Sequence, residues 1–505
     1  MANTFVVSRA QLVYALCLPL AVVLGYLLAD PMDLGTIAIV AAVLGLLSVP
    51  IFIRWYHPIL ILGWNAALQP YFLPGQPSLW MLLAVAGIIF ALLNRFVNPD
   101  ARFIHVPSLA KPLLFLLVVV IATSCLRGGI GLRMLGSSTY GSKSYFWLIT
   151  AIAGFFAMSS QRIPKERAAL FVGIYFLIGL TALIPNLAWL GGGSTQFLFY
   201  LFAPAFAGDQ FMHGEVTRFG GLTVASPALE CALLARYGIR GLFDWQRPWR
   251  MVLFVMAAFG ALFCGYRNVL IFFTVIFLVQ FYFERLYTAR ILITAASVTL
   301  ILGVLIVPNV DKLPMVAQRT LSFLPIPVSP TAKLMGEQST DWRLEVWKDA
   351  LPEIPAYLFL GKGYGMDPVE LAFAFQNSTH HISTTESMLV AGTLHNGPLS
   401  VIIPLGIWGV IGFGWFVAAS LRYLYRAYRY GNPELRCINM ALLSFFLAKL
   451  VLFLGVFGAL ADELYLFTGL IGLSVALNGA ESPVPVEVES TQTEELAYSE
   501  RLVTE

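Results

Sequence analysis

Apolar runs long enough to cross a lipid bilayer recur along the whole chain. A helix needs about 20 apolar residues for this, and fourteen runs come near that length. They lie near 11–29, 34–52, 57–72, 79–97, 112–126, 144–160, 167–190, 219–235, 249–265, 268–284, 291–308, 397–420, 438–457 and 463–479. Only 12% of the residues are charged, against roughly a quarter in a soluble domain, so lipid must solvate most of the chain. The sequence therefore predicts an all-α integral membrane protein with about 14 transmembrane helices, within a range of 12–14.

The apolar runs divide the chain into four parts. Transmembrane helices 1–11 are expected over residues 1–308 and helices 12–14 over 397–479, separated by a partly helical polar loop over 309–396. The last segment, 480–505, is acidic and contains prolines, which is typical of a disordered tail. The first run lacks a small-residue cleavage site, so we expect an anchor and not a removed signal peptide.

Lysine and arginine in the short loops predict the orientation of these spans. With the N-terminus in the cytoplasm, the basic loops QRIPKER and RYGIRGLFDWQRPWR both face the cytoplasm. The same alternation puts the C-terminus and its acidic tail in the cytoplasm. It places the loop over 309–396 on the outer side of the membrane.

Several arginines lie on the outer side, where basic residues are usually scarce. Arg218 opens the eighth span in RFGGLTVASPALE, Arg267 occupies the tight turn CGYRN, and the long loop holds Arg319 and Arg343. A single arginine in such a place can reach out to lipid headgroups. Several arginines beside short turns and one loop favour an anion site, because the planar guanidinium binds phosphate through two parallel hydrogen bonds.

Two opposite charges lie near the middle of predicted spans. Glu230 is about halfway along the eighth span and Lys449 about halfway along the thirteenth. Either charge alone would be costly in lipid, so we expect the two to pair. The pair has two interpretations, a structural brace between helices or a proton or ion relay.

The outer loop contains its own local patterns. STDWRLEVWKDALPEI predicts a helix that begins at Ser339, Thr340 or Asp341 and places Arg343 and Trp347 on one face. The glycines of LGKGYG predict a turn, which could be a plain turn or could direct backbone N–H groups toward an anion.

Histidines occur at two places after this turn. His380 and His381 could join Glu386 in a metal site, could contact sugar or could be ordinary loop residues; we expect no metal. The stretch GTLHNGPLS places His395 and Asn396 at the start of the twelfth span. An imidazole with a pKa near 6.5 suits a general base, although a polar residue here can also cap a helix.

Taken together, these pieces resemble the O-antigen ligase and O-antigen polymerase superfamily over roughly residues 215 to 420. The resemblance rests on the order of several weak motifs. They are Arg218, the Gly265/Arg267 turn, Arg343/Trp347, Gly361/Gly363, His395/Asn396 and the glycine-rich IPLGIWGVIGFGWF. Two features depart from the pattern, since Tyr266 stands where a serine often precedes the arginine, and fourteen spans exceed the usual twelve or so.

The resemblance implies a GT-C-like glycosyltransferase of the bacterial inner membrane with a periplasmic active site. The donor would be a glycan on undecaprenyl pyrophosphate, and the acceptor either lipid A core or another lipid-linked glycan, as in lipopolysaccharide or exopolysaccharide synthesis. Ligase and polymerase remain open. No cofactor, metal or nucleic acid is expected. The expected catalytic residues are His395, Arg267 and Arg218, and the expected substrate-binding residues are Arg343, Trp347, Asn396, Arg319 and His381.

The residues fit this chemistry on their own terms. Transfer leaves negative charge on the departing pyrophosphate, which fixed cations stabilise, while a base accepts the proton of the acceptor hydroxyl. The rival from another class is a secondary transporter that uses Glu230 and Lys449 as a coupling pair. Against it, the sequence shows no internal repeat and no pair of broken helices in matching halves.

Overall fold

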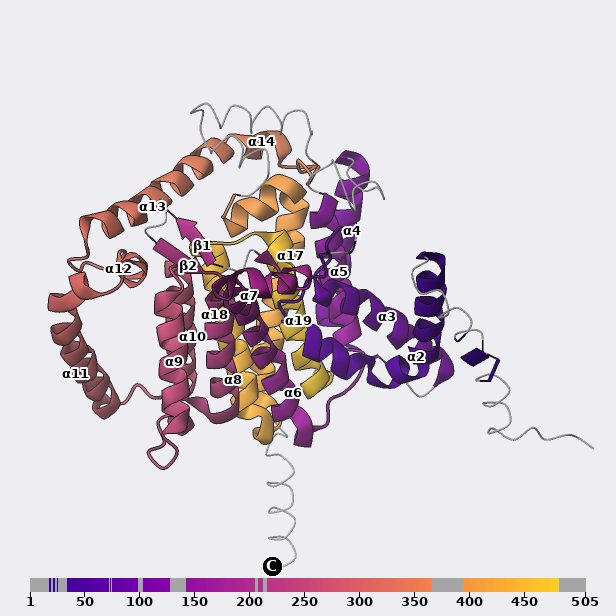
Figure 1. Ribbon diagram of the computed structural model, residues 1–505, viewed down its shortest axis with the longest axis horizontal. Helices are drawn as coiled ribbons and strands as arrows, with labels where there is room; N and C mark the ends of the chain where they lie inside the picture. The colour runs from indigo at the N-terminus through magenta and orange to yellow at the C-terminus, as the bar shows by residue number, and fades with distance from the viewer. Residues whose placement is uncertain are drawn as a thin grey trace, which may run out of the picture. The chain divides into compact units, whose positions relative to one another are not determined.

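The computed structural model describes residues 34–71, 73, 75–98, 103–127, 142–204, 208–211, 216–365 and 394–480, with a few positions between 18 and 25. It forms two compact units, Met1–Tyr56 and His57–Glu505. The second unit holds every described element after α2 (Figure 1). Those elements are α3 (Leu79–Val97), α4 (Pro107–Arg127), α5 (Ser142–Met158), α6 (Lys165–Leu177), η2 (Ile178–Ala182), α7 (Leu183–Leu190), η3 (Gly192–Tyr200), β1 (Gly208–Phe211), β2 (Val216–Phe219), α8 (Leu222–Leu242), α9 (Trp249–Phe263), α10 (Arg267–Phe283), α11 (Ala289–Ile306), η5 (Val307–Lys312), α12 (Met315–Leu321), α13 (Pro330–Ala350), α14 (Glu353–Tyr357), α17 (Gly397–Tyr430), η6 (Pro433–Leu435), α18 (Arg436–Gly455) and α19 (Leu460–Asn478).

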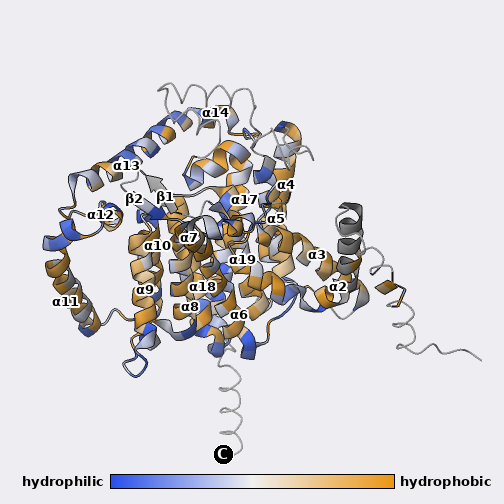
Figure 2. Ribbon diagram, viewed as in Figure 1, coloured by the Kyte–Doolittle hydropathy of each residue, from blue (hydrophilic) through white to orange (hydrophobic). Residues whose placement is uncertain are grey.

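The structure is that of a multi-pass membrane protein. Among the described residues, seven helical segments are long and apolar enough to cross a membrane, and four shorter apolar helices accompany them. Hydrophobic residues run along α9, α10 and α18, whereas α13 is largely hydrophilic (Figure 2). The seven segments are Leu79–Phe96, Pro107–Arg127, Lys165–Leu190, Ala289–Lys312, Gly397–Tyr430, Pro433–Gly455 and Leu460–Asn478.

The chain departs from the expected spans at its second and third runs. A single helix, α2 (Leu34–Gly63), runs through the residues between the separate spans expected over 34–52 and 57–72, and it ends at Gly63. The residues between the two runs include one charge, Arg54, and no glycine, so nothing there ends a helix. The prediction of two spans is therefore wrong at this point.

The core of the second unit surrounds α19. This helix is buried along most of its length and packs against α5 and α17, while α17 packs against α4 and α18. Trp64 is fully buried here, and a Cβ at Gly469 would meet its indole Nε1 at 1.9 Å. A glycine in α19 is thus required for the close approach of this large side chain.

The fold is not entirely helical, because a hairpin precedes α8. Strands β1 and β2 pair antiparallel, with Asp209 opposite Arg218 in the register. Arg218 therefore lies on a strand, not at the opening of a helix as expected. The alternating, partly β-branched sequence Val-Thr-Arg-Phe favours a strand, and the two glycines that follow separate it from α8.

The described part of the polar loop over 309–396 includes α12, α13 and α14, and α13 rises from beside α12 toward α14 in Figure 1. Helix α13 begins at Pro330 and not at residues 339–341, so the predicted start is wrong. Ser329 is its N-cap and accepts a hydrogen bond from the Ala332 N–H at 3.3 Å. A serine followed by proline is a strong start signal, whereas Thr340 lies within the helix.

The glycine turn of this loop packs against a break in α17. Gly406 has a positive φ of 66° inside α17, which leaves nearby carbonyls without their helical donors. The Lys362 N–H donates to the Ile403 carbonyl at 2.7 Å, and the Gly363 N–H donates to the Pro404 carbonyl at 3.0 Å. These N–H groups hold the helix and do not face an anion, so the plain-turn interpretation applies.

Candidate active site

Four arginines from separate parts of the chain line one small cavity of about 70 Å³. They come from β2, the first residue of α10, α12 and α13, and are Arg218, Arg267, Arg319 and Arg343. The lining residues in the described part of the chain include no carboxylate. Since one water occupies roughly 10–15 Å³ on this measure, the space suits a small group such as a phosphate.

The turn before α10 brings two of these arginines together. Gly265 has a φ of +81°, and a Cβ there would meet the Arg218 Cγ at 2.8 Å. The Arg218 guanidinium lies over the Tyr266 ring, 5.1 Å from its centroid. Arg267 donates through Nη2 to the Thr340 hydroxyl of α13 at 2.7 Å. The turn thus needs its glycine both for its backbone shape and for the packing of Arg218.

Arg319 lies deepest in this group, with 9% of its surface exposed. Its Nη1 donates to the Gly265 carbonyl at 3.3 Å. Burial, and then the charges of Arg218, Arg267 and Arg343, lower the pKa of Arg319 to about 10, against a smaller opposing effect of Tyr266. Arg319 therefore stays protonated at neutral pH, and the cavity concentrates positive charge.

His395 lies beside the Arg343 side of the cavity. Its ring stacks on Phe457 at 5.0 Å, and the Arg343 guanidinium lies 5.7 Å from the same Phe457 ring. Trp342 packs against the imidazole at 5.4 Å. Burial, and then the positive charge of Arg343, lower the pKa of His395 from its ordinary value of 6.5. The imidazole is therefore neutral at neutral pH, the state in which it can accept a proton.

Two neighbours fix the main chain on either side of His395. Its own φ is +49°, a conformation that costs energy for a residue with a side chain. Asn396 caps α17, since its Oδ1 accepts from the Leu399 N–H at 3.0 Å. Trp347 donates from Nε1 to the Leu394 carbonyl at 2.9 Å. Neither Asn396 nor Trp347 lines the arginine cavity, so the structure gives both a supporting position around the histidine.

A larger, mainly apolar cavity of about 240 Å³ adjoins the arginine cavity. Asn268, which follows Arg267, lines both, and Phe457 lines the larger one. Lys449 and Glu463 supply its charges. The site thus combines a cationic end with an apolar extension among α8, α10, α18 and α19.

The expected pairing of Glu230 with Lys449 is wrong. Lys449 Nζ bonds Glu463 Oε1 at 2.7 Å, an ion pair between α18 and α19. Glu230 is fully buried, and in the described structure neither of its carboxylate oxygens has a hydrogen-bond partner. Glu230 and Lys449 were expected to pair because they lie at similar depth in predicted spans. Depth does not determine which neighbouring helix a side chain faces.

His381, expected to bind substrate, lies outside the described residues, as do His380 and Glu386. Within the described ranges, no group of three His, Cys, Asp or Glu side chains could hold a metal ion.

Residues 251–414 match the family model described as O-antigen ligase. This segment, about a third of the chain, is similar to an O-antigen ligase domain. The resemblance seen in the sequence is thereby confirmed. The domain contains Arg267, Arg319, Arg343 and His395, whereas Arg218 precedes it. The match supports glycan transfer of the O-antigen ligase type in general, with glycan and lipid-linked substrates in a membrane. No curated protein matches the chain.

Four contacts of the O-antigen ligase domain's site were not foreseen from the sequence. Trp342 and Phe457 hold the imidazole, Thr340 orients Arg267, and Asn268 joins the two cavities. Thr340 was read only as a cap. Phe457 lies in the short connection after α18 and carries no local pattern that marks it, so only the fold places it here.

Proposed function

We propose that this protein transfers a glycan from undecaprenyl pyrophosphate to an acceptor hydroxyl at the periplasmic face of the bacterial inner membrane. The observation that carries the proposal is the convergence of four arginines on one cavity with a neutral histidine beside it. The O-antigen ligase domain supports the class of reaction.

The arginines act on the leaving group. When the bond between the sugar C1 and the phosphate oxygen breaks, the departing pyrophosphate takes the electron pair and gains negative charge. Arg267, Arg319 and Arg343, with Arg218 beside them, surround the space where that charge develops. Removing one preorganised donor of this kind costs about 100- to 1,000-fold in rate. An anion also relieves the repulsion among the buried guanidinium groups.

His395 acts on the acceptor. The acceptor oxygen forms the new bond to C1 while its proton passes to the imidazole, so one bond forms as the other breaks. The lowered pKa of His395 keeps the imidazole unprotonated before the reaction. Asn396 and Trp347 hold the backbone, and Phe457 and Trp342 hold the ring. This arrangement fixes the base before the acceptor arrives.

The adjoining apolar cavity fits the lipid part of such a donor. It reaches from Asn268, beside the arginines, to apolar residues of membrane helices. A polyprenyl pyrophosphate matches this arrangement, because it is charged at the pyrophosphate and apolar along the prenyl chain. The proposal therefore assigns the pyrophosphate to the arginine cavity and the first prenyl units to the apolar cavity.

The test is reconstitution of the purified protein with a radiolabelled undecaprenyl-pyrophosphate glycan in the presence of chelator. Two acceptors are offered, lipid A core and a second carrier-linked glycan, so the labelled product distinguishes ligase from polymerase. His395→Ala and Arg267→Ala should each abolish product while expression is retained. The matched controls are the exposed His105→Ala and Arg290→Ala, the latter near the start of α11. Normal transfer by His395→Ala and Arg267→Ala would refute the assignment.

A further inference from the structure

A second charged cavity lies at the other end of α17. Its volume is about 610 Å³, and it lies between the α5–α6 loop, the end of α17, the start of α18 and the end of α19. Helix α17 has 34 residues, a path of up to about 50 Å at 1.5 Å per residue. This cavity is therefore separate from the arginine site, and the proposed transfer reaction does not use it. Its polar lining includes Arg162, Lys165, Arg426, Tyr423, Tyr430 and Asn432.

The lining combines cations with apolar surface. Arg162, Lys165 and Arg426 contribute three positive charges, against one acidic residue in the lining, Glu166. At the exposed rim, Lys165 Nζ also pairs with Glu434 Oε2 at 3.6 Å. Leucine and isoleucine side chains and two tyrosines form much of the remaining wall. A small inorganic anion would leave this apolar wall uncovered, whereas an amphipathic molecule with a phosphate would contact both kinds of surface.

Hydrogen bonds between helices fix the walls of this cavity. The Tyr423 hydroxyl donates to the Gly479 carbonyl at 2.8 Å, joining α17 to the end of α19. The Ile163 N–H donates to the Ala476 carbonyl at 2.8 Å, joining the α5–α6 loop to α19. Arg162 lies against this junction, since a Cβ at Gly479 would meet its Nη2 at 3.3 Å. The cavity is thus part of the helical framework.

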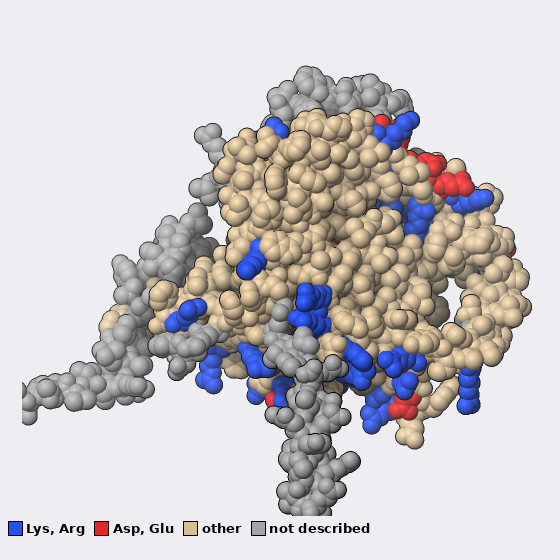
Figure 3. All heavy atoms as spheres, turned by 180° about the vertical axis from the view of Figure 1, so that it is seen from behind, with Lys and Arg blue, Asp and Glu red and all other residues tan. Residues whose placement is uncertain are grey.

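Basic residues at this end of the bundle have a simpler explanation, the bias that orients membrane helices. Figure 3 shows Lys and Arg side chains gathered along the lower edge of the molecule. Orientation requires only their number and side of the membrane. It does not require three of them to line one cavity with tyrosines, while the neighbouring Arg167 and Arg429 lie outside its lining.

We propose that this cavity binds the phosphate headgroup of an anionic phospholipid from the adjacent leaflet. Guanidinium groups bind phosphate oxygens through paired hydrogen bonds, and basic pockets between membrane helices are a known form of lipid headgroup site. Arg162 and Arg426 hold the phosphate, with Lys165 at the rim. The apolar wall contacts the glycerol backbone and the first carbons of the acyl chains.

The test is native mass spectrometry of the intact protein titrated with phosphatidylglycerol or phosphatidylcholine. Arg162→Gln, Arg426→Gln and the half-exposed Lys165→Gln are compared with Arg167→Gln and Arg429→Gln, which remove equal charge outside the cavity. Each cavity variant should weaken phosphatidylglycerol binding about fivefold, the worth of one basic residue near an anionic headgroup. The two controls should change it little, and phosphatidylcholine should bind weakly to every form.

Three outcomes would overturn the proposal. Equal losses of phosphatidylglycerol binding in cavity and control variants would show that the whole basic surface attracts the lipid. Equal binding of both lipids would show that the headgroup charge has no role. Displacement of the lipid by millimolar inorganic phosphate would assign the cavity to a free anion. The readout is binding alone, so the result is independent of whether His395 and Arg267 perform transfer.

Discussion

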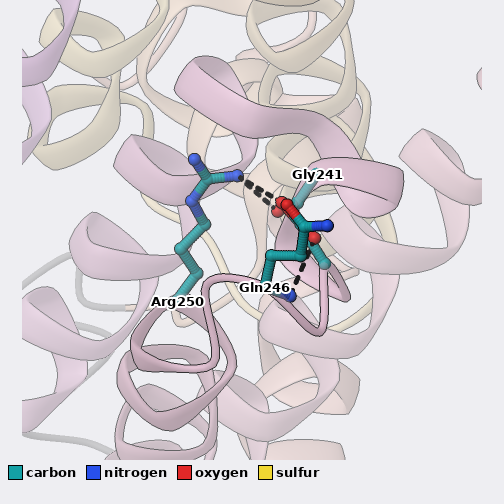
Figure 4. Close-up of polar contacts among 4 residues, drawn as sticks. Gly241, Gln246 and Arg250 are labelled. Atoms are coloured by element: carbon teal, nitrogen blue, oxygen red, sulfur yellow. Dashed lines mark hydrogen bonds and ion pairs between the residues drawn. The ribbon is translucent and has the colours of Figure 1, made fainter.

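Two buried arginines at opposite ends of the membrane helices have contrasting surroundings. Arg250, near the start of α9, is 6% exposed. Its Nη1 donates to the Gly241 carbonyl near the end of α8 at 2.8 Å (Figure 4). The same Nη1 lies 4.0 Å from the Asp244 carboxylate in the connection between α8 and α9. Its guanidinium also lies over Tyr237 at 3.9 Å. Arg319 is similarly buried and donates to the Gly265 carbonyl, but its pKa is lowered by burial and then by the charges of three other arginines, against a smaller effect of Tyr266.

The difference teaches what each cation is for. The chain supplies Arg250 with a carbonyl, a carboxylate and an aromatic face, so this side chain stabilises its loop. Around Arg319 the chain gathers like charges, which disfavours the folded protein when nothing negative is bound. A cluster of this kind gains its value from a ligand. Arg250 should therefore matter for stability and Arg319 for activity.

The largest expected effect is loss of activity in Arg319→Met. This change removes one of the cations around the leaving group, so transfer should fall about 100- to 1,000-fold. The thermal unfolding temperature should fall less than in Arg250→Met, because the variant also removes repulsion. Rates with the labelled donor and unfolding followed in detergent measure both quantities. Wild-type transfer by this variant would end the distinction between the two arginines.

Next in size is the stability loss in Arg250→Met. The change leaves the partly buried Gly241 carbonyl without this donor and removes the contact with Tyr237, at a cost of about 2–4 kcal/mol together. Transfer per folded molecule should stay near the wild-type rate. Thermal unfolding with activity normalised to folded protein checks this. If transfer by Arg250→Met falls while its stability is unchanged, Arg250 serves activity and not stability, which contradicts the contrast with Arg319.

A smaller effect is expected in inhibition by inorganic pyrophosphate. Pyrophosphate should compete with the donor in the wild-type protein, because it resembles the leaving group. In Arg343→Gln one charge-assisted contact is lost, so the inhibition constant should rise about tenfold. Arg429→Gln, at the far end of α17, is the control and should leave it unchanged. Equal inhibition of the Arg343 variant and wild type would place the pyrophosphate elsewhere.

The smallest effect concerns the pH dependence of transfer. The neutral imidazole is the active form, so activity is present above the pKa of His395 and is lost as the pH falls through it. Burial and Arg343 both lower this pKa, which moves the loss below pH 6.5. Arg343→Gln removes the second cause, so the acidic limb of its kcat profile should move to higher pH. If the acidic limb of the Arg343→Gln profile stays at the wild-type pH, Arg343 does not affect the pKa of His395.

Helix positions were largely predictable because apolar length and local breaks determine them. The run over 79–97 became α3 with the same limits, and the last run became α19 with a start only three residues earlier. The failures occurred where the signal was not local. Arg54 lies between two expected spans, yet this one charge did not end α2. Arg218 belongs to a strand that needs its partner strand to exist.

The site was predictable in its charged residues and not in its surroundings. Arginines in loops expected on the outer side stand out against the usual charge bias, and His395 stands out before an apolar run. Partners of these residues depend on helix rotation, which the apolar pattern does not specify. Lys449 therefore pairs with Glu463 and not Glu230, and Phe457 reaches His395 from a connection about 60 residues further along the chain.

The most direct measurement is a cryo-EM structure of the protein with undecaprenyl pyrophosphate carrying one sugar, captured in the His395→Ala variant so that transfer does not occur. The account predicts the pyrophosphate oxygens within hydrogen-bond distance of Arg267, Arg319 and Arg343, with the sugar facing position 395. A pyrophosphate seated beside Lys449 or at the far end of α17, with the arginine cavity empty, would contradict it.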